Sequence, residues 1–165
     1  MIPFRPAIAP PRLPDGYTLH QEPDGFGSAG RVGLAERTSD ELNRLLLACG
    51  DQPRSPERWR ATLERSVWYL RICDPHGKTV GFLRTTSDQA LNANLWDLLT
   101  DPADPARDAV LTALVRTALA RLRRELGGCS ISLSAPPEAV AALSAAGFLL
   151  DPGGIRAMGL PLRRP

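Results

Sequence analysis

The sequence predicts one α/β domain with a mostly antiparallel sheet, and three observations lead to this prediction. The chain has 165 residues, a length at which one hydrophobic core needs no disulfide or metal support. The periodicity of the apolar residues changes along the chain and gives the order β, α, α, β, β, β, α, β, α, β. Turn residues separate the second strand from the third as in a β-hairpin, so these two strands should pair antiparallel.

The first 16 residues differ in composition from the rest. Five of the 16 prolines fall within the first 15 residues, which predicts an extended proline-rich arm over residues 1–16 and a single domain over residues 17–165. The arm lacks the apolar stretch of a signal peptide and the pattern of a transit helix. No segment approaches 18 consecutive apolar residues. We therefore expect a cytoplasmic protein that does not associate with a membrane.

Each element has its own sequence signal, beginning with the alternating segment Tyr17–Gln21, which predicts the first strand. Thr38–Glu41 has the S/T-x-x-E spacing of a capping box and predicts the start of a helix that ends at Gly50. Ser55–Pro56 pairs a good N-cap residue with a proline at the first helical position, and so predicts a second helix.

The strongest strand signal lies in the middle of the chain. Val67–Ile72 and Thr79–Arg84 are rich in β-branched and aromatic residues and flank a D-P-H-G turn, which predicts an antiparallel hairpin. His76 is interpreted as a solvated residue of that turn. A loop over residues 85–92 leads to Asn94–Thr100, whose apolar density predicts a third, central strand.

The last third of the chain predicts two helices and further strands. Asp104–Pro105 is expected to open the longest helix, with Asp104 as its N-cap, and Gly127–Gly128 to end it. Cys129–Leu133 alternates as a strand, and its cysteine is interpreted as a small core residue. A short alanine-rich helix over Pro137–Ala146 follows, and Phe148–Leu162 is expected to supply one or two edge strands.

Charge and cysteine content exclude several functional classes. The formal net charge is +2, which is too balanced for a protein whose main task is to hold nucleic-acid phosphates. The three cysteines form no C-x-x-C pair, so we expect neither a zinc ribbon nor another metal site. One arginine cluster is interpreted as a solvated helix face, with an RNA- or protein-binding patch as the alternative; its members are Arg116, Arg121, Arg123, Arg124, Arg163 and Arg164.

Two stretches of sequence resemble a known family. They are RTTSDQALNANLWDLLTDP at residues 84–102, and LSAAGF at residues 143–148 followed by DPGGIRAM at residues 151–158. These runs, within a match over residues 41–160, resemble the plastid and cyanobacterial branch of the GNAT superfamily of acetyl-CoA-dependent N-acetyltransferases. The resemblance implies a mixed, mostly antiparallel central sheet with helices on both faces. It also implies acetyl transfer from acetyl-CoA to an amine.

The resemblance also implies where acetyl-CoA binds, if this chain has kept that ability. In the family the fourth strand pairs with the pantetheine arm, which corresponds here to Leu98, Leu99 and Thr100. A glycine-rich turn before the long helix holds the pyrophosphate through backbone N–H groups. Arg107 keeps a basic residue of that turn and is interpreted either as a bidentate phosphate ligand or as a surface partner of Asp104 or Asp108.

The chain departs from the family where the chemistry needs it most. The glutamine position of the turn carries Pro105, and no glycine lies between Gly81 and Gly127, so a phosphate finds fewer N–H donors and more side-chain bulk. The family's general-acid tyrosine is replaced by Leu143. The catalytic residues are therefore unassigned. Asp97 is a candidate base, with a structural partnership to an arginine such as Arg84 as the alternative.

Two functions follow from these departures. The first is a degenerate GNAT domain with impaired acetyl-CoA binding, a pseudoenzyme that acts through a protein partner or in regulation. The alternative is an active N-acetyltransferase that moves an acetyl group from acetyl-CoA to a primary amine of a small molecule or a protein. Acetyl-CoA is the cofactor only in the second case.

Overall fold

The structure, a computed structural model, describes residues 12–22 and 32–154, with the side chains of residues 32–37 excluded. Its strands are β1 (Thr18–Glu22), β2 (Trp68–Cys73), β3 (Thr79–Ser87), β4 (Asn92–Thr100) and β5 (Ser130–Leu133). Its helices are α1 (Val32–Ala48), α2 (Pro56–Glu64), α3 (Arg107–Glu125) and α4 (Val140–Ala145), with short 3-10 turns η1 (Pro137–Ala139) and η2 (Pro152–Gly154).

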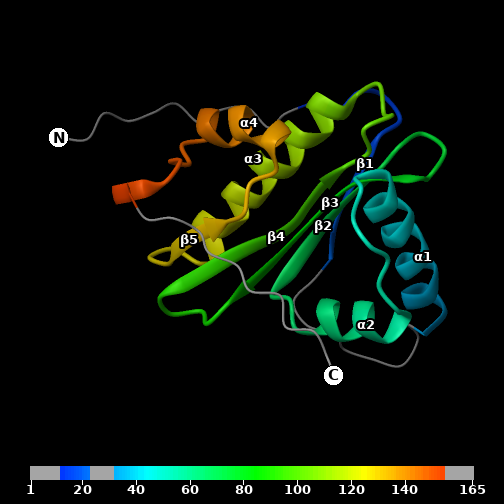
Figure 1. The fold of residues 1–165 in the computed structure, drawn as a ribbon, viewed down its shortest axis with the longest axis horizontal. Coiled ribbons are helices and arrows are strands. Elements are labelled where there is room, and N and C mark those ends of the chain that lie inside the picture. Colours follow the sequence, from blue (N-terminus) through cyan, green and yellow to red (C-terminus); the bar gives the residue numbers. More distant parts are fainter. Residues whose placement is uncertain (1–11, 23–31, 155–165) are drawn as a thin grey trace.

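The five strands form one mixed sheet between two layers of helices (Figure 1). The strand order is β1-β2-β3-β4-β5, the first four strands pair antiparallel, and β5 runs parallel to β4. Helices α1 and α2 cover one face, and α3 and α4 cover the other. The predicted fold class is confirmed, and so are the hairpin of β2 and β3 and the interior position of the next strand, β4.

Two hydrophobic clusters hold these layers together. The smaller one joins α1 and α2 to the sheet through Trp59 and Phe82, whose rings meet edge to face at 6.0 Å. The larger one lies beneath α3, which approaches β3 closely at Gly81. A Cβ atom on this glycine would lie 2.6 Å from Cγ1 of Val110, so only glycine fits there. In the described part of the chain, no helix is long and apolar enough to cross a membrane.

The first helix begins earlier than the capping-box spacing predicts. It starts at Val32, so Thr38 and Glu41 lie inside it. Residues three apart also lie on one face of a continuous helix, which is why the spacing alone does not mark a start. The Glu41 carboxylate instead accepts hydrogen bonds from Arg71 (3.0 Å) and from the Thr79 hydroxyl (2.6 Å), and so ties α1 to the sheet.

The tail after α4 also differs from its prediction. Edge strands were expected within Phe148–Leu162, but the described part of this segment, up to residue 154, contains only the turn η2. Asp151, Gly153 and Gly154 all have positive φ angles, a backbone conformation that a strand excludes. Residues 155–162 lie outside the described residues, as do residues 1–11 of the predicted proline-rich arm.

Candidate functional site

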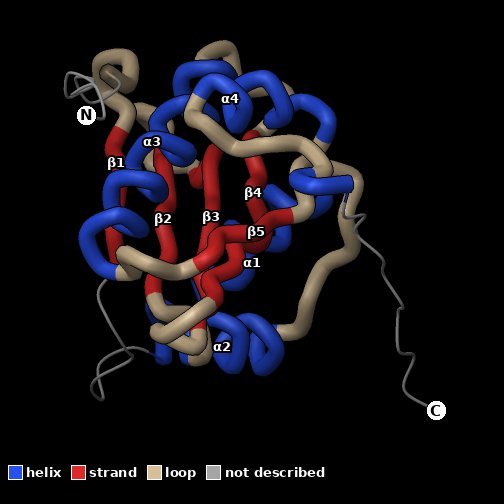
Figure 2. The backbone as a smooth tube through the Cα atoms, turned by 90° about the vertical axis from the view of Figure 1, so that its left-hand side faces the viewer, coloured by secondary structure: helices blue, strands red, loops and turns tan. Residues whose placement is uncertain are grey.

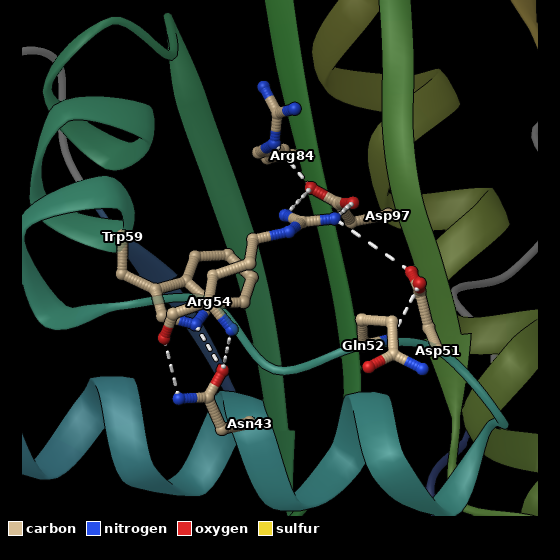
Figure 3. A network of polar contacts seen from close by, with 7 residues as sticks. All are labelled: Asn43, Asp51, Gln52, Arg54, Trp59, Arg84 and Asp97. Carbon is tan, nitrogen blue, oxygen red and sulfur yellow. Dashed lines mark hydrogen bonds and ion pairs between the residues drawn. The ribbon is translucent and has the colours of Figure 1, made fainter. Parts of the chain in front are cut away.

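A β-bulge in β4 places Asp97 at the centre of the candidate site. Phe82 pairs with Leu99 and Arg84 with Trp96, so β4 carries one residue more than β3 between these pairs. Asp97 absorbs the extra length with a φ of 53°, which aspartate tolerates better than most residues. Its side chain lies on the face covered by α1 and α2, where two arginines reach it (Figure 3).

Two arginines bind the Asp97 carboxylate. Arg54 donates from Nη2 to Oδ1 at 2.7 Å and from Nη1 to Oδ2 at 3.1 Å, while Arg84 donates from Nε to Oδ2 at 2.5 Å. Only 10% of the Asp97 side chain is exposed. Burial acts to raise the pKa of Asp97, but the hydrogen bonds from Arg54 and Arg84 outweigh it and hold the pKa below its ordinary value.

The loop between α1 and α2 orients Arg54. Its backbone N–H and carbonyl each bond to the Asn43 amide at 2.8 Å. The indole N–H of Trp59 donates to the same amide oxygen, also at 2.8 Å, and its ring lies 4.6 Å from the Arg54 guanidinium carbon. Sequence reasoning anticipated the contact of Asp97 with Arg84 but not Arg54, which lies 43 residues away in a loop without periodicity.

The other predicted catalytic position offers no acid. Leu143 lies on α4, is 3% exposed and belongs to the large core cluster. A leucine side chain has no proton to give. As a candidate base Asp97 is equally constrained, because both its oxygens already accept hydrogen bonds from cations. The bulge is therefore a structural ion-pair centre in this geometry.

The strands β4 and β5 separate beyond the first half of β4. Their parallel pairing runs from Asn92 with Ser130 to Leu95 with Leu133. Residues 96–100 of β4 continue without a β5 partner, and Figure 2 shows β5 beside one end of β4 only. This leaves the second half of β4 without a strand partner on that side in the described part of the chain. Of the predicted cofactor residues on β4, Leu98 and Thr100 are buried at 8% and 4% exposure, and Leu99 packs against the α1 and α2 cluster.

The turn that follows β4 contains two consecutive D-P-A motifs that fold in the same way. In the first, the Asp101 carboxylate accepts the Ala103 N–H at 2.9 Å, and the Asp101 carbonyl accepts the Asp104 N–H at 3.1 Å. Lys78 also donates to this carboxylate at 2.6 Å. Burial acts to raise the pKa of Asp101, but the hydrogen bonds from Lys78 and Ala103 leave it lowered.

The second motif repeats the pattern one turn later. The Asp104 carboxylate accepts the Ala106 N–H at 2.7 Å, and the Asp104 carbonyl accepts the Arg107 N–H at 3.1 Å. Tyr17 donates its hydroxyl to the same carboxylate at 3.0 Å. Asp104 was predicted to be the N-cap of α3, but the N-cap is Ala106, without a side-chain bond. Asp104 closes its own turn instead, because an aspartate before proline bonds readily to the N–H two residues on.

Together these bonds occupy the backbone donors of the turn. Asp101 donates its own N–H to the Val80 carbonyl at 2.8 Å, so every N–H from residue 101 to residue 107 has an acceptor within the described residues. Pro102 and Pro105 have no N–H. The side chains of three aspartates, at positions 101, 104 and 108, add negative charge. Residues 101–107 therefore offer a pyrophosphate group no free backbone donor, and among the described residues only the N–H groups of Asp108 and Ala109 in the first turn of α3 stay without an acceptor.

Arg107 spans from the end of β4 to the start of η1. Its Nε donates to the Thr100 hydroxyl at 3.1 Å and its Nη2 to Glu138 at 2.8 Å. In the described part of the chain these are its partners, in place of the predicted Asp104 or Asp108. The Cys49 thiol donates to the Thr100 carbonyl at 3.4 Å, and burial raises the pKa of this thiol. The hydroxyl and the carbonyl of Thr100 are therefore both hydrogen-bonded within the protein.

One member of the predicted arginine face is not solvated. Arg121 has a side chain that is 7% exposed. Its guanidinium lies 5.1 Å above the Trp68 ring and bonds to Glu125. Arg116, Arg123 and Arg124 are exposed on α3, while Arg163 and Arg164 lie outside the described residues. The sequence placed Arg121 on the face away from the apolar stripe, and that prediction is wrong because its long side chain folds over the Trp68 ring.

Comparison with known proteins identifies relatives of this chain. No family model matches the chain. It is 28% identical to GCN5-related N-acetyltransferase 1, chloroplastic, of Arabidopsis thaliana, over 89% of this chain and 75% of that protein. It is 30% identical to the uncharacterized N-acetyltransferase ycf52 of Pyropia yezoensis, over 72% and 68%. It is 32% identical to Serotonin N-acetyltransferase 2, chloroplastic, of Oryza sativa, over 71% and 59%.

Solved structures agree at the level of the fold. A GNAT-family acetyltransferase of Streptococcus pneumoniae matches with a TM-score of 0.61 and 15% identity, over 90% of this chain and 99% of that one. An acetyltransferase of Trypanosoma brucei matches with a TM-score of 0.62 and 16% identity, over 88% and 99%. The mixed sheet with a short parallel β5 and helices on both faces is the fold that these acetyltransferases share. With the relatives above, the chain belongs to the GNAT superfamily of N-acetyltransferases.

Proposed function

We propose that this chain is a GNAT-superfamily protein that has lost productive acetyl-CoA binding and does not catalyse acetyl transfer. One observation carries the proposal: the turn between β4 and α3 has no backbone N–H group left for a pyrophosphate within residues 101–107. A phosphate there would have to break bonds that each contribute about 0.5–1.5 kcal/mol, and would meet carboxylates instead of donors.

Two further features of the site support the proposal. Arg107, the cation best placed for a phosphate, is already paired with Glu138 and Thr100. The general-acid position holds the buried Leu143. The paired Arg107 and the carboxylates of the turn both weaken the attraction for a phosphate. Leu143 removes the acid that would protonate the departing thiolate. All of these changes act against acetyl transfer.

An active N-acetyltransferase is the second candidate, and one observation favours it. Residues 96–100 of β4 have no β5 partner, so the edge at which the family binds pantetheine is preserved. In this case the acceptor would be a primary amine of a small molecule or a protein. The Arabidopsis and rice relatives are named as N-acetyltransferases, the rice protein for serotonin.

In the favoured case we propose that the domain acts by binding a protein partner. Large apolar side chains near the end of α4 support this: Leu149 and Leu150 are 78% and 74% exposed. Replacing both with serine should remove copurification of a partner from the native cell extract while leaving the melting temperature unchanged. Unchanged copurification would contradict a role for this surface.

We retain a cytoplasmic location in the proposal. Cell fractionation tests it, since the Arabidopsis and rice relatives are named as chloroplastic.

Titration with S-acetylpantetheine beside acetyl-CoA tests which part of the cofactor is affected. The two compounds share the thioester and the pantetheine arm, and only acetyl-CoA carries the pyrophosphate. Our proposal expects no melting shift with either compound and no thioester cleavage in the presence of amines. Acetyl-CoA also carries the 3′-phosphoadenosine group, so a shift that acetyl-CoA causes and S-acetylpantetheine does not would show that the chain holds the nucleotide part of the cofactor, pyrophosphate included, and would contradict the proposal.

A further inference from the structure

Beyond the cofactor region, one face of the sheet carries a polar strip next to α1 and α2. Arg84 pairs with Trp96, Thr86 with Asn94, and Asn94 with Ser132, so these side chains lie on the same face of β3, β4 and β5. All of them are partly or fully exposed. We call this set the β3–β5 polar face; its residues are Arg84, Thr86, Asn94, Trp96 and Ser132.

Arg84 presents an unused edge to this face. Its Nε is committed to Asp97, and in the described part of the chain its two terminal nitrogens make no hydrogen bond. They are not among the buried unpartnered atoms, which are Trp68 Nε1 and Thr85 Oγ1, so they reach solvent. Figure 3 shows both terminal nitrogens pointing away from Asp97. A guanidinium held by one edge offers the other edge, with parallel N–H groups, to a planar anion.

Trp96 supplies a fixed flat surface beside that edge. Its indole N–H donates to the Thr86 hydroxyl at 2.8 Å, which sets the orientation of the ring. The ring centroid lies 5.7 Å from the Arg84 guanidinium carbon, and 43% of the residue is exposed. An exposed indole next to a cation favours a ligand that joins an apolar ring to a negative charge.

The remaining polar groups also favour an anion. The Ser132 hydroxyl donates to Oδ1 of Asn94 at 2.5 Å, which leaves the Asn94 amide N–H groups as donors. Asp97, the nearest carboxylate, is neutralised by Arg54 and Arg84. Asp51 lies 3.9 Å from Arg54 on the far side of that pair. In the hairpin turn beyond Thr86 and Asn94, the Asp88 carboxylate has no cationic partner among the described residues, and it accepts the backbone N–H groups of residues 90–92 instead. The face itself carries no carboxylate other than the paired Asp97.

We propose that the β3–β5 polar face binds a small organic carboxylate that carries a flat apolar group. The carboxylate accepts hydrogen bonds from the two terminal nitrogens of Arg84, the apolar group packs on the Trp96 ring, and a second acceptor of the ligand reaches Asn94. The site uses no residue of the turn after β4. It therefore does not depend on whether that turn holds a pyrophosphate, and it goes beyond the proposed function.

Trp96 is also the reporter that the test needs. The other two tryptophans, Trp59 and Trp68, are 0% and 1% exposed, so a ligand in solution acts on the emission of Trp96. Hippurate (N-benzoylglycine) combines a phenyl ring with a carboxylate, and hippuramide replaces the carboxylate with a neutral amide of the same shape. We expect a saturable change of emission with hippurate, and binding at least tenfold weaker with hippuramide.

The variants separate the site from a general loss of structure. Arg84→Gln should weaken hippurate binding at least tenfold. Arg71→Gln is the matched control, since Arg71 lies on the neighbouring strand β2, is similarly buried (18% exposed, against 15%) and is paired with Glu41 of α1. This variant should bind hippurate like the parent protein. If Arg84→Gln lowers the melting temperature too far for titration, Asn94→Ala, which alters an outward side chain, should still weaken binding several-fold.

Four results would overturn the proposal. They are equal binding of hippurate and hippuramide, no saturable change with either, unchanged affinity in both Arg84→Gln and Asn94→Ala, and displacement of hippurate by inorganic phosphate at equal concentration. The last result would assign the face to inorganic anions. None of these results depends on whether acetyl-CoA binds, so failure here is distinct from failure of the proposed function.

Discussion

Replacing Asp97 with asparagine should destabilise the protein by about 3 kcal/mol at neutral pH. Asp97 accepts three hydrogen bonds from two guanidinium groups. Bonds to charged groups contribute about 1.5–3 kcal/mol each, and removing one partner of a buried ion pair costs about 3–5 kcal/mol. The lower end applies, because Arg54 and Arg84 are 26% and 15% exposed and water can still reach them. Asparagine keeps the positive φ and the shape, so the charge is what changes.

Urea denaturation gives the free energy of unfolding, and the melting temperature should fall by roughly 6–12 °C for a chain of this size. The pKa of Asp97 is lowered in the folded protein, so its charge stabilises the fold above the ordinary carboxyl pKa of about 3.9. That contribution is lost as the pH falls through the folded pKa. The difference in the free energy of unfolding between the parent and Asp97→Asn should therefore decrease as the pH is lowered from about 5.

Glu138→Gln is the control for this prediction. It breaks the ion pair with Arg107, in which both side chains are about one third exposed, at 30% and 42%. An exposed pair of this kind contributes about 0–1 kcal/mol. Two results would refute the reasoning about the ion-pair centre. One is a loss of stability below about 1 kcal/mol in Asp97→Asn at pH 7. The other is a difference in the free energy of unfolding between the parent and Asp97→Asn that stays the same as the pH is lowered.

Three further substitutions test the packing and the turns by urea denaturation. Gly81→Ala should cost about 1–3 kcal/mol, because the new Cβ would meet Val110 at 2.6 Å; an unchanged midpoint would show that α3 can shift freely. Tyr17→Phe should cost about 1 kcal/mol by removing the 3.0 Å bond to Asp104, and no loss would mean that water replaces the hydroxyl fully. Ser55→Ala removes the N-cap bond of α2 at 3.3 Å and should cost about 1 kcal/mol, whereas Ser55→Thr should keep most of it.

Local signals in the sequence were sufficient for most of the fold. β-Branched and aromatic content located β2 and β3, and apolar density located β4, because these strands have helices on both faces of the sheet. The Ser55–Pro56 pair located α2, because cap and helix are adjacent in the chain. The start of α1 was missed because the partners of Glu41 are distant in the sequence. Glu41 is used by Arg71 and Thr79, which lie 30 and 38 residues away, and a local spacing rule contains no information about them.

The candidate site was predictable only in part. Asp97 and Arg84 both lie in the sequence run that resembles the family, 13 residues apart on paired strands, and their contact was one of the two interpretations of Asp97. Arg54 was missed because its place depends on how the α1–α2 loop folds around Asn43 and Trp59. Pro105 indicated a missing donor and Asp104 was predicted as an N-cap, but the sequence alone did not show that Asp101 and Asp104 would each close a turn on the N–H groups that follow. That result needs the three-dimensional path of residues 101–107.

The most direct test of the central claim is the melting temperature of the full chain with and without acetyl-CoA. At about one hundred times a micromolar dissociation constant, a ligand that binds the folded state raises its stability by about 2.7 kcal/mol, which is roughly 5–11 °C here. The engaged N–H groups of residues 101–107 predict no shift. A saturable rise of several degrees would contradict the account.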